Sequence, residues 1–212
     1  MMGHKDHHGH GHHGHDHARG RHGNPEDLAA YVGKLEGADR ADWPTPDEVV
    51  RALAVAPGQT VVDVGAGPGY FAIRLARAGA HVFAVEVEPK LIELLRDRVR
   101  DAGATDGVTP VLGLPDDPLV PPASSDLALV IDTFHHFPDG VDYLRRLQRA
   151  LRPGGRIVNI DFHQRELPVG PPPDHKVSRE EFLQVADAAG LTLAREETFL
   201  PYQYFLELRP KS

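Results

Sequence analysis

Short, continuous runs of valine, isoleucine and leucine punctuate residues 60–161 of the chain. Strands that are covered on both faces carry such unbroken runs, so the pattern predicts a buried parallel sheet. The runs occupy residues 60–64, 81–87, 109–113, 126–131 and 156–161. Amphipathic stretches between them, at about 69–78, 89–102 and 139–151, predict helices. Strands that alternate with helices in this way indicate βαβ units and an α/β fold.

A helix before the first strand has a clear start signal. Thr45 has the character of an N-cap, Pro46 suits the first helical position, and Glu48 completes a capping box. Pro57 and the glycine after it predict where this helix ends.

The last part of the chain departs from the βαβ rhythm. Ser178 and Glu181 form a second capping box, which predicts a helix that runs to Gly190. Two strand-like runs follow, at 191–199 and 202–208, and only two residues separate them. A connection this short cannot cross over the sheet, so the two strands must be antiparallel neighbours. The sequence therefore predicts a doubly wound, mostly parallel, Rossmann-like sheet that ends in an antiparallel hairpin.

Composition narrows the class of protein. The chain has 212 residues, 41% of them hydrophobic, and no cysteine. One well-buried domain is expected at this length, and disulfides and thiolate metal sites are excluded. The net charge of −8 divides into +1 on residues 1–23 and −9 on the remainder, so neither nucleic acid nor an anionic membrane is an expected partner. Without an apolar span or a secretory signal, we expect a cytoplasmic protein; its oligomeric state is not readable.

Residues 1–23 form a histidine-rich leader, with nine of the 14 histidines between residues 4 and 22. The leader has almost no apolar side chains to bury, so we expect it to be disordered. Flexible imidazoles capture nickel, zinc or copper. The candidate metal ligands are His7, His8, His10, His12, His13, His15 and His17. Residues 24–45 are expected to form a helical cap before the main domain at 46–212.

The strongest chemical signal is a glycine-rich turn between the first strand and the next helix. Glycines at 65, 67 and 69 let the backbone turn sharply and let a ligand approach the peptide groups. The helix that follows presents free N–H groups at the same place. In an open α/β sheet, ligands bind at this end of the strands.

Two acidic residues indicate which ligand the turn receives. Glu86, at the end of the second strand, is placed to accept hydrogen bonds from both hydroxyls of an adenosine ribose. Asp63, two residues before the first glycine, would repel a pyrophosphate but suits a cationic amino group. The dinucleotide pattern G-x-G-x-x-G also fails, because its last position is Tyr70. The charges therefore favour a sulfonium cofactor over NAD.

With these motifs, the chain resembles the class I S-adenosylmethionine-dependent methyltransferase superfamily, and within it the branch of the ubiquinone and menaquinone methyltransferases. The resemblance covers about residues 45–208. It is carried by VVDVGAGPGYF at 61–71, AVEVEP at 84–89, the segment 126–132 and LRPGGRIVNID at 151–161. It implies a seven-stranded sheet with the reversed hairpin described above.

The resemblance also implies where the cofactor binds. Asp63 and the turn of Gly65, Ala66, Gly67, Pro68 and Gly69 would hold the methionine portion, and Glu86 would hold the ribose. Val87, next to Glu86, is a further candidate cofactor-binding residue. The backbone at Asp132 and Thr133 would line the amino end, and Asp116 would face the adenine. Relatives often have Asp-Ala where this chain has Leu114 and Pro115, and proline has no N–H to offer the adenine ring.

The acceptor side offers fewer signals. His135 and His136 follow the fourth strand, where a histidine can remove a proton from the acceptor; His136 is the first candidate. A packing or capping role for the pair is the alternative. Asp161 and His163 follow the fifth strand and could reach the same pocket, although ordinary loop contacts are the favoured interpretation.

The sequence thus predicts a methyltransferase that uses S-adenosylmethionine and acts on a small-molecule acceptor. The alternative is a metal-handling protein whose leader is functional and whose cofactor-binding domain is catalytically idle. Removal of residues 1–23 would separate the two, because turnover survives it only under the first hypothesis.

Overall fold

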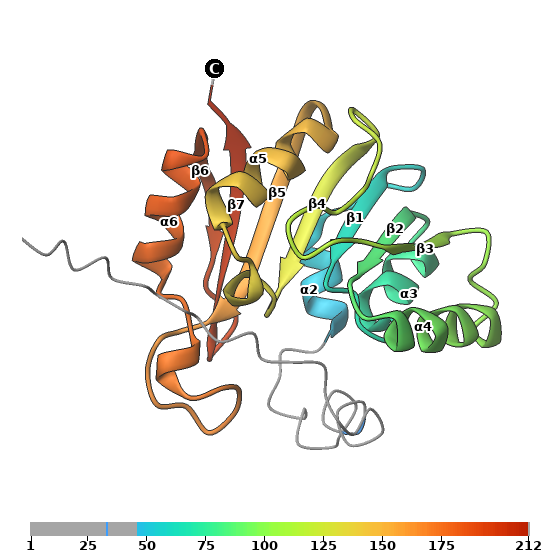
Figure 1. Cartoon of the computed structure of the whole chain (residues 1–212), viewed down its shortest axis with the longest axis horizontal. Helices are drawn as coiled ribbons and strands as arrows, with labels where there is room; N and C mark the ends of the chain where they lie inside the picture. Colours follow the sequence, from blue (N-terminus) through green and yellow to red (C-terminus); the bar gives the residue numbers. More distant parts are fainter. Residues whose placement is uncertain (1–32, 34–45, 212) are drawn as a thin grey trace, which may run out of the picture.

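The computed structural model describes residue 33 and residues 46–211. A seven-stranded sheet runs through this part of the chain in the order β3-β2-β1-β4-β5-β7-β6 (Figure 1). The strands are β1 (Thr60–Val64), β2 (His81–Glu86), β3 (Val108–Leu112), β4 (Ser125–Ile131), β5 (Leu151–Phe162), β6 (Leu191–Glu197) and β7 (Gln203–Pro210). The first five pair in parallel, whereas β7 is antiparallel to both β5 and β6. The predicted fold class, with its closing hairpin, is confirmed.

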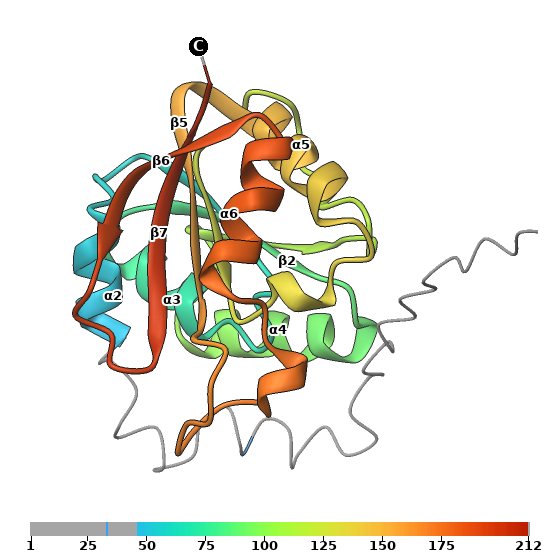
Figure 2. The ribbon, with the colours of Figure 1, turned by 90° about the vertical axis from the view of Figure 1, so that its left-hand side faces the viewer.

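Helices cover both faces of the sheet (Figure 2). The helices α2 (Pro46–Leu53), α3 (Tyr70–Arg77) and α4 (Pro89–Asp101) pack on one face, and α5 (Gly140–Ala150) and α6 (Arg179–Ala188) pack on the other. Short 3-10 helices follow β4 and β5, namely η2 (Phe134–His136) and η3 (Pro173–His175). Between them, the two helical layers bury the hydrophobic runs of the strands.

Neighbouring residues of a strand supply two separate cores. Val61 of β1 packs with the α2–α4 layer, and the next residue, Val62, packs with the α5–α6 layer. Leu129 and Val130 of β4 divide in the same way. Successive strand side chains point to opposite faces, so a strand covered on both sides must be apolar at every position. This is why the central strands carry unbroken hydrophobic runs.

The capping signals largely fix where helices begin and end. The Ser178 hydroxyl accepts the backbone N–H of Glu181 at 3.0 Å, as the second capping box predicts. Gly79 and Gly103 follow α3 and α4 with φ of 95° and 63°, the left-handed conformation expected at a helix end. Helix α2 is shorter than the proline and glycine near residue 57 suggest: it ends at Leu53, and Ala54 takes a φ of 47°.

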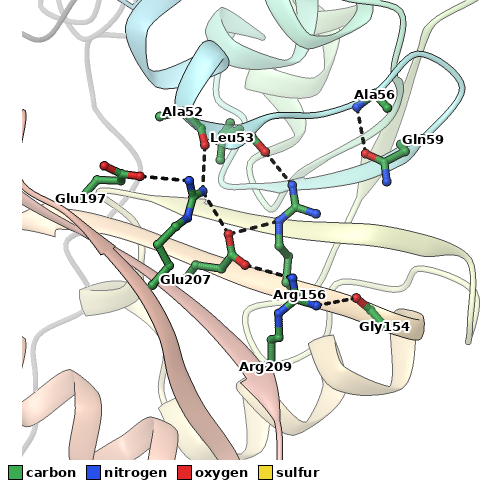
Figure 3. Close-up of polar contacts among 10 residues, drawn as sticks. Ala52, Leu53, Ala56, Gln59, Gly154, Arg156, Glu197, Glu207 and Arg209 are labelled. Carbon is green, nitrogen blue, oxygen red and sulfur yellow. Dashed lines mark hydrogen bonds and ion pairs between the residues drawn. The ribbon is translucent and has the colours of Figure 1, made fainter.

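A buried acidic side chain joins α2 to the sheet. Glu207 of β7 accepts from Arg195 at 3.0 Å and from Arg209 at 3.1 Å, and it lies 3.5 Å from Arg156 (Figure 3). We call these four residues the Glu207 cluster. Two of its arginines also donate to the last carbonyls of α2, Arg195 to Ala52 and Arg156 to Leu53 (Figure 3). Cations at this end of a helix complement its dipole.

The ends of β1, β4 and β5 define the edge of the sheet that matters for function. The segment that joins β5 to α6 and contains η3 extends beyond this edge (Figure 1). The expected leader at 1–23 and cap at 24–45 lie outside the described residues, apart from residue 33. The domain boundaries given above therefore stay predictions.

Candidate functional site

The glycine-rich turn joins β1 to α3. Gly65, Gly67 and Gly69 have φ values of 71°, 52° and 87°, a region that side chains other than glycine rarely enter. The backbone N–H groups of Gly65 and Ala66 both donate to the Val85 carbonyl at 2.9 Å. These bonds tie the turn to the end of β2, where the second acidic residue lies.

Gly65 is required by its neighbour as well as by its backbone conformation. A Cβ at this position would lie 2.4 Å from the Thr133 hydroxyl oxygen. The turn therefore packs directly against the end of β4. The gap between β1 and β4 is where the strand order of the sheet reverses, and open α/β sheets bind their ligands at such a point.

Glu86 closes the turn from the β2 side. Its carboxylate accepts backbone N–H groups from Gly67 at 3.0 Å, Val87 at 2.7 Å and Glu88 at 3.1 Å. Burial raises the pKa of Glu86, and these three N–H donors oppose that rise. Ribose hydroxyls, like these N–H groups, can donate hydrogen bonds to a carboxylate, so the position of Glu86 suits the ribose of a ligand bound at the turn.

Asp63 lies under the turn at the end of β1 and is 4% exposed. Its Oδ2 atom has no hydrogen-bond partner among the described residues. Burial raises the pKa of this carboxyl to about 7, partly offset by the backbone N–H of Ala72 at the start of α3. A buried, partly unsatisfied acid is costly unless a cation or donor reaches it, so the site fits the amino group of a methionine moiety.

Apolar side chains remain uncovered beside the turn. Val87, Leu112 and Leu114, near the ends of β2 and β3, are 46%, 47% and 48% exposed. Exposed aliphatic residues gathered at a ligand edge suit the flat face of an adenine ring. Asp116 is exposed at the tip of a turn closed by Leu114 and Asp117, so its predicted role toward adenine has no contact here that supports it.

The residues after β4 complete the cofactor side. Asp132 has a φ of 48°, unusual for a residue that is not glycine. The side-chain amide of Gln203 donates to both Asp132 carboxylate oxygens, at 2.9 and 3.1 Å. Gln203 begins β7, and the sequence analysis assigned no role to this residue. Only the antiparallel topology brings it there, so no local pattern could have revealed it.

The two histidines of η2 differ in their surroundings. The His135 side chain is 13% exposed, and its Nδ1 lies 3.7 Å from Oδ2 of the fully buried Asp161. His136 is exposed, and the centroids of the two rings are 4.1 Å apart. The structure therefore puts His135, rather than His136, on the inner side. Asp161 lies within β5, which continues to Phe162, and not in the loop after the strand, where ordinary loop contacts were the favoured interpretation.

The metal hypothesis has no counterpart in the described part of the chain. Within residues 46–211 no group of three or more histidine or acidic side chains is arranged to hold a metal ion. The seven leader histidines lie outside the described residues. Among the helices described, none is long and apolar enough to cross a membrane.

Comparison with known proteins finds relatives that are methyltransferases. Residues 62–159 match the family described as "Methyltransferase domain". The chain is 32% identical over 139 residues to 27-O-demethylrifamycin SV methyltransferase of Amycolatopsis mediterranei, covering 63% of this chain and 50% of the relative. It is 31% identical over 112 residues to demethylmenaquinone methyltransferase of Tropheryma whipplei, covering 53% and 45%. The chain thus spans about half the length of these relatives.

Solved structures give the same fold. A SAM-dependent methyltransferase from Aquifex aeolicus superimposes with a TM-score of 0.80 at 24% identity, covering 86% of this chain and 97% of that one. The matched family region begins inside β1 and contains Asp63, the glycine-rich turn, Glu86 and Asp132. The fold thus agrees with a solved relative, and the candidate site lies inside the region that matches the family. Across the matched region the chain is similar in sequence to methyltransferases, and its fold is that of the class I S-adenosylmethionine-dependent methyltransferase superfamily.

Proposed function

We propose that this protein transfers a methyl group from S-adenosylmethionine to a small-molecule acceptor. One observation carries the proposal: a glycine-rich turn at the reversal point of the sheet has a buried carboxylate on either side, Asp63 and Glu86. Two acids suit a ligand with a cationic amino end and a ribose. Asp63 is unsuited to the pyrophosphate of NAD, which would bring negative charge to the same turn, whereas Glu86 suits the ribose of either cofactor.

The turn and its neighbouring residues would each bind a different part of the cofactor. Asp63 binds the amino group, with Asp132 and Thr133 beside it. The carboxylate of Glu86 would accept from the ribose hydroxyls, and the exposed side chain of Val87 would pack against the adenine. The glycines leave room for the ligand against the backbone. When bound, the cofactor supplies an electrophilic methyl carbon, which an acceptor lone pair attacks while the C–S bond breaks with its electrons kept by sulfur.

The protein's own contribution is to align the acceptor and to exclude water. Orientation of two reactants lowers a barrier by up to about 7–11 kcal/mol. Of the two candidate bases, His135 has the inner position and His136 the outer one. The relatives named above act, by their names, on small molecules, 27-O-demethylrifamycin SV and demethylmenaquinone. Residues 24–45, with Tyr31 and Trp43, would complete the acceptor pocket.

Calorimetric titration of S-adenosylmethionine and of its demethylated product into the full chain tests the proposal, with EDTA present to strip the leader of metal. We expect micromolar binding of both. Asp63→Ala and Glu86→Ala should weaken binding strongly, whereas Asp187→Ala, an exposed acid paired with Lys211, serves as the charge-matched control.

Each failure has its own meaning. No binding of either ligand to wild-type protein would overturn the proposed function. Wild-type affinity in both site variants would leave the function standing and overturn the site assignment. An NADH titration should show no binding, and tight binding of NADH would favour a dehydrogenase instead.

A further inference from the structure

His135 and Asp161 each have one buried polar atom without a hydrogen bond, and these two atoms lie close together. His135 Nδ1 and Asp161 Oδ2 both lack a hydrogen bond within the described residues, and they lie 3.7 Å apart. The distance is longer than a hydrogen bond, but catalytic hydrogen bonds are often loose before ligands bind. Two buried, unsatisfied polar atoms that face each other are costly in a merely structural role.

Two other polar side chains near Asp161, those of Lys176 and Tyr204, form their hydrogen bonds elsewhere. The other oxygen of Asp161, Oδ1, accepts the backbone N–H of Phe162 at 2.8 Å. Lys176, 4% exposed, donates its ammonium group to the Arg165 carbonyl at 2.7 Å. The Tyr204 hydroxyl donates to the Val177 carbonyl at 3.2 Å. Oδ2 is therefore directed to His135 while Oδ1 stays fixed to the backbone of β5.

We propose that the methyl acceptor is a hydroxyl compound, that His135 removes its proton, and that Asp161 positions His135 for this step. The inference rests on the proposed function and deepens it. With Nδ1–H facing Asp161, the Nε2 lone pair is free for the acceptor. The acceptor oxygen gives its proton to Nε2 and forms the new C–O bond. Asp161 then stabilises the imidazolium, as a carboxylate does behind a catalytic histidine.

The chemistry of the acceptor atom explains why a hydroxyl is singled out. A neutral amine is nucleophilic without help and can shed its proton to water after transfer. A hydroxyl oxygen is a poor nucleophile until it loses its proton, so it gains most from a positioned base. A base with a buried carboxylate behind it is the arrangement that enzymes use to activate hydroxyl groups. The position of the pair fits, since Thr133, two residues before His135, packs against the glycine-rich turn.

The deciding experiment is a long-range ¹H–¹⁵N NMR spectrum of histidine-labelled full-length protein with S-adenosylhomocysteine present, in which His135→Gln identifies the signals of His135. We expect neutral His135 to carry its proton on Nδ1, and Asp161→Asn to abolish that preference. A neutral His135 protonated on Nε2, or an unchanged tautomer in Asp161→Asn, would overturn the inference. The wild-type spectrum decides even if the variant fails to fold.

Turnover supplies the second measurement. S-adenosylhomocysteine release is followed with acceptors that differ only in the attacking atom, catechol against o-phenylenediamine and 4-nitrophenol against 4-nitroaniline. We expect release with a hydroxyl member, lowered roughly 10²–10⁴-fold by His135→Gln. Asp161→Asn should lower kcat and leave KM for S-adenosylmethionine unchanged. His81→Gln, at an exposed position that begins β2, is the matched control. Release from the amines alone, unaffected by His135→Gln, would contradict the proposal.

The proposal can fail separately from the proposed function. Calorimetry on the same samples shows whether S-adenosylhomocysteine binds. Binding together with the wrong tautomer refutes only the role of the pair, whereas absence of binding refutes the methyltransferase itself.

Discussion

Replacement of Glu207 by glutamine should destabilise the fold by more than its hydrogen-bond distances suggest. The side chain is 8% exposed, and its nearest buried partner, Arg156, is 12% exposed and lies 3.5 Å away. Glutamine keeps the shape but removes the charge that three guanidinium groups face. Removal of one member of a buried ion pair costs about 3–5 kcal/mol, because the other charge stays buried without compensation.

The expected loss lies somewhat below that range. Arg156 keeps its bond to the Leu53 carbonyl. Arg195 and Arg209 are 38% and 45% exposed, so water screens their charges and each contributes about 1 kcal/mol or less. We therefore expect Glu207→Gln to lower the free energy of unfolding by about 2–3 kcal/mol and the melting temperature by about 4–12 °C.

A second Glu→Gln substitution provides the control. Glu196 of β6 binds Arg179 through two bonds, at 2.8 and 2.6 Å, which are shorter than any bond made by Glu207. Its side chain is 31% exposed, however, so Glu196→Gln should cost only about 0.5–1 kcal/mol. Urea denaturation followed by circular dichroism compares the two. A larger loss for Glu196→Gln would refute the reasoning, because distance rather than burial would then decide. Affinity for S-adenosylhomocysteine should be unchanged in both variants.

The pH dependence of the protein should reflect Asp63. Burial raises the pKa of Asp63 from 3.8 to about 7, so its contribution to stability is fully present below about pH 3.8 and is lost as pH rises through about 7. Urea denaturation across this range should show the decrease in the free energy of unfolding, and Asp63→Asn should remove it. Binding depends on pH in the opposite direction, because a cationic amino group needs the ionised carboxylate. Affinity for S-adenosylhomocysteine should rise roughly 25-fold between about pH 5.5 and about pH 7.5, and a flat profile would contradict the assigned role. Gly65→Ala should unfold the turn or abolish cofactor binding, since both its φ and the Thr133 side chain oppose a Cβ. At Gly190 φ is 89° but a Cβ would meet open space, so Gly190→Ala should lower the free energy of unfolding by only about 1–2 kcal/mol and should leave binding intact. Thr133→Ala should partly restore binding to Gly65→Ala, because it removes the side chain that a Cβ at residue 65 would meet.

The sequence predicts the fold well where local rules suffice. The range 60–64 coincides with β1, because a buried strand and a glycine-rich turn both leave strong local signals. The strand expected at 156–161 in fact begins at Leu151, because that residue pairs with Ser125 across an irregular register that only the assembled sheet defines. Likewise, α2 ends early at carbonyls that two arginines from distant strands bind.

The candidate site divides in the same way. Asp63, Glu86 and the glycines lie within one βαβ unit, so their spacing along the chain already indicates their role. Gln203 reaches Asp132 across 71 residues, and Asp161 meets His135 from a different strand. Contacts of this kind depend on the order of the strands in the sheet and not on a periodic pattern along the chain. The sequence was compatible with both contacts but could not predict them.

The Glu207 cluster has a consequence for how the chain acquires its structure. Helix α2 is the first helix of the described 46–211 segment, yet its two cluster bonds span 103 and 143 residues. Contacts between such remote parts of a chain form late, because a long loop must close first. During synthesis the arginine on β6 emerges only after the five parallel strands have been made. We therefore expect α2 of the nascent chain to stay undocked until the closing hairpin has been made, so that synthesis of β6 and β7 fixes α2 in place.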